Sequence, residues 1–128
     1  MTVPREVISG ENVPATIGPY SPAVRAGDFV YVSGQPGVDP ATAEPAGPDL
    51  AAQARQAMKN VEAVLRAAGT NLAQVVNTTV LVADISQFAV VNDVFAEAFP
   101  TDPPARMTMQ VPLPHGLLIS IGCVAIVG

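Results

Sequence analysis

The sequence contains few charged side chains, and positive charges are the scarcest. Six Lys or Arg residues stand against eleven Asp or Glu in 128 residues, so the formal net charge is −5. Nucleic-acid binding requires a basic stripe, and anionic membrane surfaces attract basic segments. The composition therefore argues against nucleic acid and membrane as partners.

Cysteine and histidine occur once each, as Cys123 and His115. One cysteine cannot close an internal disulfide, and this fits a reducing cytoplasm best. A metal centre usually needs several His, Cys or carboxylate ligands, so we expect no metal site, and nothing in the chain calls for a cofactor. The apolar surroundings of Cys123 in the sequence predict a small core residue rather than a nucleophile.

The sequence also lacks any apolar run long enough to span a bilayer, and residues 1–6 do not have the apolar segment of a secretory signal. We therefore expect a cytoplasmic protein. A chain of this length usually forms one domain, so residues 1–128 are predicted to be a single domain. Hydrophobic residues make up 49% of the chain. This apolar surplus predicts surfaces that become buried between subunits.

Periodicity predicts the order strand, strand, strand, helix, strand, helix, strand, strand. The expected strands cover residues 5–9, the segment before a turn at 26–28, and residues 29–33, 75–83, 107–111 and 117–127. Asp49 is the expected N-cap of a helix that begins at Leu50 and closes at Gly69. A second helix is expected from residue 86 or 87 to Phe99.

The same patterns predict where one strand ends and which faces of two other strands are buried. The third strand is expected to end within 33–37, and 39–48 is predicted to be a loop. In the strand at 75–83, one face is predicted to be buried, and its members are Val76, Thr78, Val80 and Val82. The last strand is apolar almost throughout and is expected to be buried on both faces.

This order of elements suits an α+β fold in which a mixed β-sheet carries both helices on one face. The other face of the sheet would be bare in a monomer. We therefore expect it to meet other copies of the chain, which agrees with the apolar surplus.

Arg106 stands out because positive charges are so few. Pro103 and Pro104 precede it and hold the chain extended, and the residues from Met107 to Val111 alternate as in a strand. A guanidinium fixed at the start of a strand is suited to binding a planar carboxylate through two parallel hydrogen bonds. The alternative is an arginine that closes a surface ion pair, and spacing alone does not separate the two interpretations.

Short motifs occur in a fixed order along the chain. They are residues 17–21 (Ile-Gly-Pro-Tyr-Ser), 33–35 (Ser-Gly-Gln), 53–56 (Gln-Ala-Arg-Gln) with Asn60, 91–92 (Val-Asn), 104–106 (Pro-Ala-Arg) and 113–114 (Leu-Pro). In order and spacing these motifs resemble the Rid family of reactive intermediate deaminases, also called YjgF/YER057c/UK114. The resemblance runs from about Val13 to Ala125.

The resemblance implies a chorismate mutase-like fold and a homotrimer, whose sheets form a barrel-like centre with three clefts between subunits. Deaminases of this family hydrolyse enamines and imines, released by pyridoxal-phosphate enzymes, to 2-keto acids and ammonia. The resemblance assigns Arg106 to the substrate carboxylate. It places Tyr20, Ser33 and Asn92 at further substrate-binding positions, and Thr108 stands where the family often carries a cysteine.

The last strand departs from the deaminase pattern. The deaminase branch reads approximately Ile-Glu-Ile-Glu-Ala-Ile-Ala there, and its first glutamate orients or activates the attacking water. Residues 119–125 are Ile-Ser-Ile-Gly-Cys-Val-Ala, so Ser120 replaces that glutamate. A serine hydroxyl without a neighbouring base can hold a water but cannot deprotonate it. The catalytic candidates are thus Arg106, as the carboxylate clamp, and Ser120, as a water holder.

Local sequence leaves structural alternatives for several of these residues. Tyr20 and Ser33 can equally be packed loop residues, and Asn92 can cap or bridge backbone groups. His115, in a proline-bounded turn, is either a solvated side chain or a titrating group at the edge of the cleft. A catalytic pair of His115 and Ser120 is conceivable, but five residues of turn and strand do not guarantee its geometry.

Three functions follow from these observations. The first is a deaminase that acts on small imine or enamine acids. The second is a diverged family member that does not deaminate, and that binds a small carboxylate or serves a pathway-specific reaction in the same cleft. The third, an endoribonuclease or translation inhibitor, has been attached to some relatives, and the acidic balance of this chain argues against it.

Overall fold

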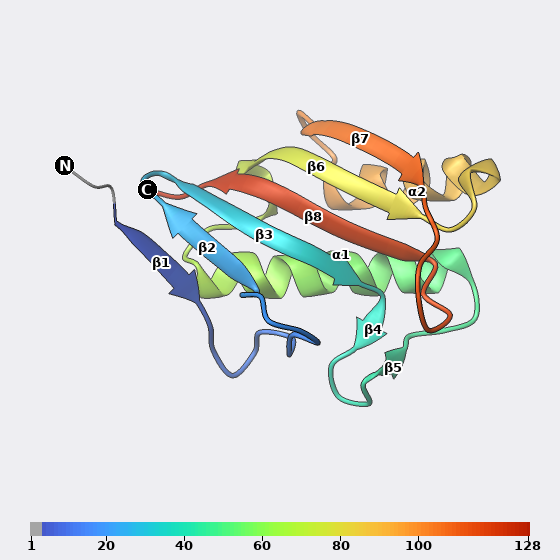
Figure 1. The fold of residues 1–128 in the computed structure, drawn as a ribbon. Coiled ribbons are helices and arrows are strands. Elements are labelled where there is room, and N and C mark those ends of the chain that lie inside the picture. Colours follow the sequence, from blue (N-terminus) through green and yellow to red (C-terminus); the bar gives the residue numbers. More distant parts are fainter. Residues whose placement is uncertain (1–3) are drawn as a thin grey trace.

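A six-stranded sheet carries both α-helices on one of its faces (Figure 1). The computed structural model describes residues 4–128. The strands follow the spatial order β1, β2, β3, β8, β6, β7, with bounds β1 Arg5–Ile8, β2 Ala23–Ala26, β3 Phe29–Pro36, β8 Ile119–Ile126, β6 Val75–Val82 and β7 Ala105–Gln110. The helices are α1 Leu50–Ala67 and α2 Phe88–Ala98, with short 3₁₀ turns at Leu72–Gln74 and Ile85–Gln87. The predicted α+β fold with two helices is confirmed.

The strands are antiparallel to their neighbours except for β6 and β7, which run parallel. A parallel pair needs a crossover connection, and α2 provides it. As a result, β7 lies at one edge of the sheet with α2 close behind it. Figure 1 shows β1 at the opposite edge.

The ends of α1 follow the predicted capping chemistry. The Asp49 carboxylate accepts a hydrogen bond of 2.9 Å from the Ala52 amide, so it satisfies one of the free N–H groups of the first turn. Gly69 follows the helix with φ of +85°, a conformation in which a side chain would be strained. These two residues account for the predicted start and end of α1.

Four details differ from the sequence-based predictions. The strand β3 does not end at Ser33 but continues to Pro36 through a bulge between Val32 and Gln35, because a bulge accommodates the small residues that looked like a stop. The predicted loop at 39–48 contains a small hairpin, β4 Val38–Asp39 with β5 Glu44–Pro45. A bulge between Val75 and Asn77 turns Val76 outward, where it is 40% exposed.

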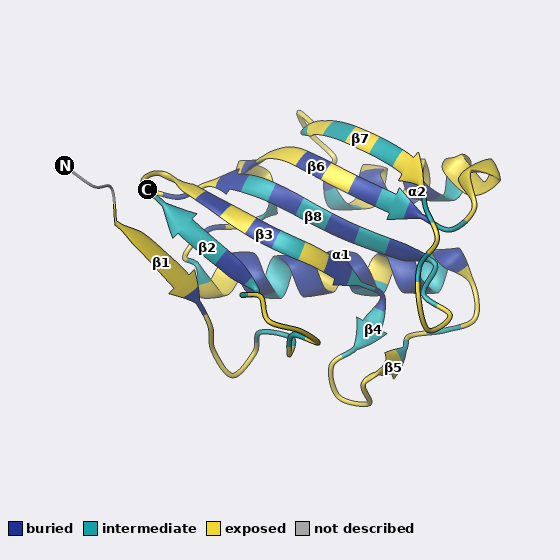
Figure 2. Cartoon of the chain, in the orientation of Figure 1, coloured by how far each residue is buried: buried dark blue, intermediate teal, exposed yellow. Residues whose placement is uncertain are grey.

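The fourth difference is the last strand, which is buried on one face only. In β8 the odd-numbered residues from Ile119 to Ala125 are buried, whereas Ser120, Gly122 and Val124 are half-buried. Figure 2 shows this alternation along the central strands. An apolar run suggested burial on both sides, but a single chain provides helices for one side only. The other sheet face is open.

The core lies between the sheet and the helices. Apolar side chains of α1 and α2 pack against the inward residues of β3, β8 and β6, and the largest fully buried ones include Leu65, Ile119 and Ile121. Among residues 4–128, neither helix combines the length and the apolar character that crossing a membrane requires.

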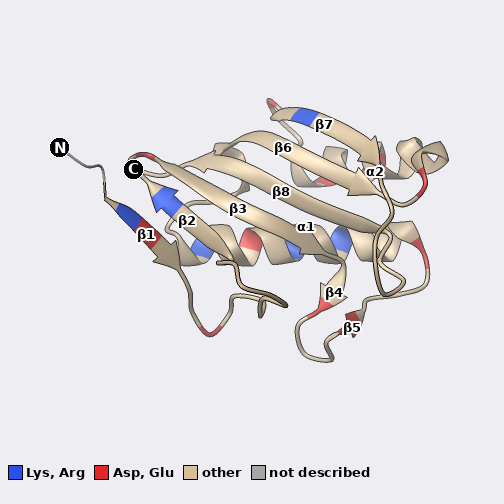
Figure 3. Cartoon of the chain, in the orientation of Figure 1, with Lys and Arg blue, Asp and Glu red and all other residues tan. Residues whose placement is uncertain are grey.

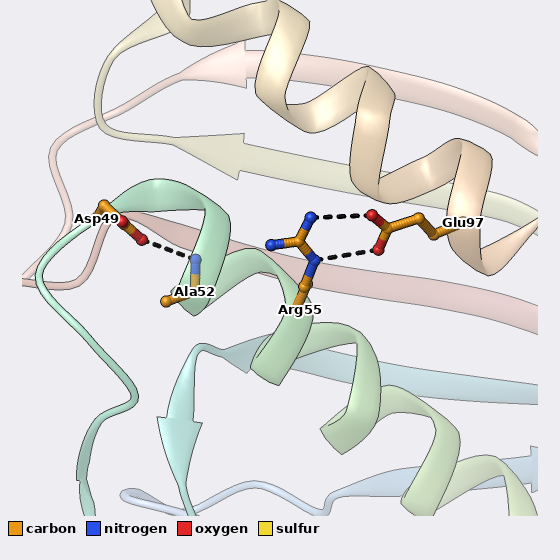
Figure 4. A network of polar contacts seen from close by, with 4 residues as sticks. All are labelled: Asp49, Ala52, Arg55 and Glu97. Atoms are coloured by element: carbon orange, nitrogen blue, oxygen red, sulfur yellow. Dashed lines mark hydrogen bonds and ion pairs between the residues drawn. The ribbon is translucent and has the colours of Figure 1, made fainter.

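A bidentate ion pair joins the two helices on their outer side (Figure 4). The guanidinium of Arg55 donates to both carboxylate oxygens of Glu97, at 3.1 and 2.9 Å. The hydrogen bond from Arg55 lowers the pKa of Glu97 and raises that of Arg55. Both side chains are about half exposed, so this pair adds little to stability and mainly fixes how α2 lies against α1.

Gln53 is a buried polar side chain that connects α1 to two loops. It is 1% exposed, and its amide nitrogen donates to the carbonyl oxygens of Gly47, at 3.0 Å, and Gly116, at 3.4 Å. Its amide oxygen accepts from the Leu118 N–H at 2.9 Å. The chain also passes close to this residue at Gly37, where a Cβ would lie 2.3 Å from the Gln53 carbonyl oxygen. Gln53 therefore sets the position of three segments that surround α1.

The first prediction concerns Gln53. Replacing it in Gln53→Met keeps the length of the side chain but removes its hydrogen bonds to Gly47, Gly116 and Leu118, which lie at the edge of the core, at a cost of about 0.5–1.5 kcal/mol each. We expect the free energy of unfolding in urea to fall by about 2–4 kcal/mol. The matched control is Gln74→Met, at an exposed residue, which should change it by less than about 0.5 kcal/mol. Equal effects of the two variants would contradict this role.

Candidate functional site

Arg106 projects from the edge strand β7 toward α2. The guanidinium carbon lies 5.1 Å from the centre of the Phe88 ring and 4.8 Å from the centre of the Phe95 ring. Its Nη2 donates a 2.7 Å hydrogen bond to the side-chain oxygen of Asn92. Phe88, Asn92 and Phe95 are spaced by four and three residues, so they share one face of the helix. One stripe of α2 thus holds the guanidinium in place.

Arg106 has no acidic partner among residues 4–128. Both salt bridges of the described chain involve other residues, Arg55 with Glu97 and Arg66 with Glu62. The alternative of a surface ion pair for Arg106 is therefore wrong for the single chain. Figure 3 shows that the neighbouring strands β6, β8 and β3 carry no charged residue. A held guanidinium with free N–H donors and no carboxylate at ion-pair distance within residues 4–128 is suited to an anionic ligand.

A hollow of about 570 Å³ lies beside Arg106. The C-terminal half of α2 and the segment that leads into β7 form its walls. The wall residues include Asn92, Phe95, Phe99, Pro103 and Pro104. Two of the walls are the predicted prolines, which hold this segment extended. The hollow is therefore apolar, with Asn92 and Arg106 as its polar members.

Thr108 lies two residues after Arg106 and on the same face of β7. Its hydroxyl oxygen is buried and has no hydrogen-bond partner within the described chain. Buried hydroxyls usually have a partner, so an unpaired one beside a candidate site marks a place where a ligand or water can donate or accept.

The other predicted site residues lie elsewhere in the chain. The Tyr20 side chain is 45% exposed, and its hydroxyl accepts a 3.3 Å hydrogen bond from the Ile17 N–H. The Ser33 hydroxyl donates a 2.6 Å hydrogen bond to the Ser21 carbonyl and is therefore engaged in fixing the loop. Ser120 projects from β8 to the open face of the sheet, since it alternates with buried Ile119 and Ile121.

Gly34 connects Ser120 with Tyr20. A Cβ at Gly34 would lie 2.6 Å from the Ser120 hydroxyl oxygen, so only glycine fits there without displacing it. Gly34 also lines a cavity of about 280 Å³ together with Tyr20, Ile17 and His115. The cavity lies between the loop 14–20, the β4–β5 hairpin and the turn that leads to β8. Ser120, Gly34 and Tyr20 therefore form one group.

The two groups of candidate residues lie on different sides of the sheet. In the ladder from β7 through β6 to β8, Arg106 pairs with Thr78 and Thr78 pairs with Cys123, and both partners are buried on the helix side. Ser120 lies on the opposite, open side. A ligand held by Arg106 cannot also reach Ser120 of the same chain. The sequence did not reveal this separation, because it depends on the strand register.

Cys123 lies in the core, 6% exposed, and burial raises the pKa of its thiol to about 12. The thiolate is therefore negligible near neutral pH, and the prediction of a small core residue is confirmed. The aromatic partners of Arg106 were missed as site residues. Phe88 and Phe95 lie in the predicted second helix, and their spacing around Asn92 is the signal in the sequence that could have found them.

Comparisons with known proteins bear on the whole chain. A family model described as Endoribonuclease L-PSP matches residues 10–127. The human 2-iminobutanoate/2-iminopropanoate deaminase is 45% identical over 125 residues, which cover 97% of this chain and 91% of the human protein. The structure of RidA from Psychrobacter sp. PAMC 21119 is 40% identical with a TM-score of 0.91, covering 95% of this chain and 99% of that one. E. coli TdcF, solved with bound serine, is 33% identical with a TM-score of 0.88, covering 96% and 99%.

These matches extend over nearly the full length of each relative. They agree with the order of the motifs at 17–21, 33–35 and 104–106, and with the six-stranded sheet that carries two helices. The fold and the sequence thus lead to the same assignment as the motifs did. The chain belongs to the Rid (YjgF/YER057c/UK114) family.

Proposed function

We propose that this protein hydrolyses small 2-imino or 2-enamino acids to 2-keto acids and ammonia, in a cleft formed between subunits. The observation that carries the proposal is Arg106. Its guanidinium is held by Phe88, Asn92 and Phe95 and has no carboxylate partner in the described chain. A planar cation with free donors fits the carboxylate that every such substrate carries.

The relatives support the same chemistry. The human protein with 45% identity is named a 2-iminobutanoate/2-iminopropanoate deaminase, and the similar structure of TdcF holds serine, a small amino acid with a carboxylate. In this chain the substrate carboxylate would pair with Arg106. Asn92 and Thr108 would contact the rest of the ligand, since both lie beside the guanidinium and have polar atoms available.

The reaction needs a second set of groups at the imine carbon. Water adds to that carbon, protons move from the water oxygen to nitrogen, and the C–N bond breaks to release ammonia. Tyr20 and Ser120 are the proposed contacts on this side, with Ser120 as a holder of the water. Because Ser120 lies on the open side of the sheet and Arg106 on the helix side, Ser120 would come from a neighbouring subunit, and Tyr20 would come with it, since both adjoin Gly34.

A homotrimer would supply that neighbour. The open sheet face exposes large apolar side chains, including Tyr31 at 51%, Met107 at 57% and Met109 at 43%, and it has no helix to cover it. A patch of this kind on a small protein marks an interface. Three sheets meeting at their open faces would bury it and would bring Arg106 of one subunit toward Ser120 of the next.

Ser120 itself favours the second candidate function, a family member that binds a small carboxylate without deaminating it. A serine cannot accept the proton from water near neutral pH. Nothing else on the open face of β8 is titratable, since its outward neighbours are Gly122 and Val124. The two candidates share the Arg106 clamp and differ only in whether the bound imine is hydrolysed.

The Arg106 clamp gives the first functional prediction. In Arg106→Ala the carboxylate loses one or two charge-assisted hydrogen bonds of about 1.5–3 kcal/mol each, so kcat/KM for 2-iminopropanoate should fall at least about 10-fold. Arg106→Lys keeps the charge but loses the paired donors, and it should also be impaired. The imine is generated by an amino-acid oxidase, and its decay is compared with the uncatalysed rate. Arg66→Ala, at an exposed arginine, is the control. Full activity in Arg106→Ala would contradict the clamp.

A second prediction separates the two candidate functions through Ser120. If the wild type hydrolyses 2-iminopropanoate weakly, then Ser120→Glu should raise kcat, by up to about 100- to 10,000-fold, because it adds a carboxylate base at the water position. Ser120→Gln has the same shape without the base and should give no such increase. If the wild type does not accelerate hydrolysis and only Ser120→Glu does, the protein is the non-deaminating member.

A third prediction concerns assembly. Light scattering should give a mass three times the 13.1 kDa of one chain. Tyr31→Asp places a charge on the apolar sheet face, so it should shift the protein toward monomer and lower deaminase activity with the loss of the shared cleft. The matched control, Ile85→Asp, changes an exposed apolar residue that lies between β6 and α2, and it should remain trimeric. A monomeric wild type would contradict the inter-subunit site.

A further inference from the structure

The turn that carries His115 has a left-handed backbone and lies beside the cavity that Tyr20 and Gly34 line. His115 and Gly116 have φ of +57° and +71°, and the Leu117 N–H donates a 3.1 Å hydrogen bond to the Pro114 carbonyl, which closes a tight turn. Buried Gln53 bonds to Gly116 and Leu118, which follow His115 in the sequence. A non-glycine residue in the left-handed region is uncommon and is a reason to look for a function.

His115 lines the 280 Å³ cavity that Tyr20 and Gly34 also line. Gly34 is the residue against which the Ser120 hydroxyl lies, so the cavity adjoins the position where a water would be held. One further titratable residue, Glu44 on the β4–β5 hairpin, lines the same cavity. Tyr20, Glu44 and His115 are thus the titratable groups that surround it.

These three groups differ in their suitability as a base. Of the three side-chain types, imidazole is the one whose ordinary pKa lies nearest neutral pH, so it is the best suited to accept and return a proton there. Glu44 and His115 are both exposed, and Glu44 sits on a two-residue strand that pairs with β4. The residues after His115 bond to the buried amide of Gln53 through the Gly116 carbonyl and the Leu118 N–H, and this segment continues directly into β8 and Ser120.

We propose that His115 is a further catalytic residue of this protein and performs the proton transfer that Ser120 cannot. Neutral imidazole accepts a proton from the attacking water while the water oxygen bonds to the imine carbon. The imidazolium then gives this proton to nitrogen, which completes a carbinolamine. The imidazole next carries the proton of the new hydroxyl to the same nitrogen, the C–N bond breaks with its electron pair going to nitrogen, and ammonia leaves as the 2-keto acid forms. The imidazole ends in its starting state. This inference rests on the proposed deaminase function.

The test compares pH–rate profiles of three variants on 2-iminopropanoate. His115→Asn removes the titrating ring and tolerates the left-handed backbone. Activity of the wild type should rise with pH as the imidazole loses its proton. In His115→Asn this rise should be absent, and kcat should fall about 100-fold. Glu44→Gln should keep the rise of activity with pH. Glu62→Gln, on the outer side of α1, should match the wild type, and thermal melting checks that all variants fold.

The single histidine allows an independent measurement. In protein without a histidine tag, the only imidazole proton signals in the NMR spectrum belong to His115, so their titration gives its pKa directly. This pKa should equal the kinetic one, and added pyruvate, a 2-keto acid product, should shift both the signals and their midpoint. In the double variant His115→Asn with Ser120→Glu, the carboxylate should restore activity.

Each outcome decides one of the two proposals. Two results would overturn the role of His115 and leave the deaminase function standing. They are an unchanged pH profile in His115→Asn, and loss of the rise of activity with pH in Glu44→Gln. NMR signals that do not respond to pyruvate at any concentration would also overturn it. If the wild type accelerates hydrolysis at no pH, the proposed function fails, and the role of His115 fails with it.

Discussion

A β-strand sends successive side chains to opposite faces of its sheet, and the candidate site of this protein depends on that constraint. The register of β7, β6 and β8 places Arg106 on the helix side and Ser120 on the open side. No rotamer change can bring these two side chains together within one chain. A ligand that needs both must lie between two copies, so the proposed activity and the proposed assembly cannot be separated.

The helix side of the sheet shows how the fold prepares the carboxylate clamp. An arginine side chain loses conformational freedom when it binds, and α2 reduces that loss beforehand by placing two rings and an amide around the guanidinium. The ring contacts contribute about 0.5–2 kcal/mol each, depending on exposure. Asn92 accepts from one N–H and carries no charge, so it orients the guanidinium without neutralising it. A carboxylate in that place would have competed with the ligand.

The elements that depend on local sequence were predicted well, and those that depend on pairing were not. Asp49 and Gly69 act within their own turn, so the ends of α1 could be read from the sequence. The bulge after Val32, the outward turn of Val76 and the one-sided burial of β8 depend on neighbouring strands and on whether a second layer covers the sheet. In the site, the scarcity of positive charges singled out Arg106, but the sequence left a surface ion pair open, and the contact of Arg106 with Phe88 and Phe95 required the parallel placement of β7 beside α2.

The open side of the site depends on a different buried residue, Gln53. Its side-chain amide bonds to Gly47 in the loop before α1 and to Gly116 and Leu118 in the turn before β8. The residues of that turn lie 63 and 65 positions after Gln53 in the sequence. Water has no access to this amide. If one of its hydrogen bonds is lost in the folded state, a polar group of the amide therefore stays unpaired. The same bonds fix the turn that carries His115 and the start of the strand that carries Ser120. Stability and site geometry therefore share one set of contacts, and substitutions near Gln53 should alter activity before they unfold the protein.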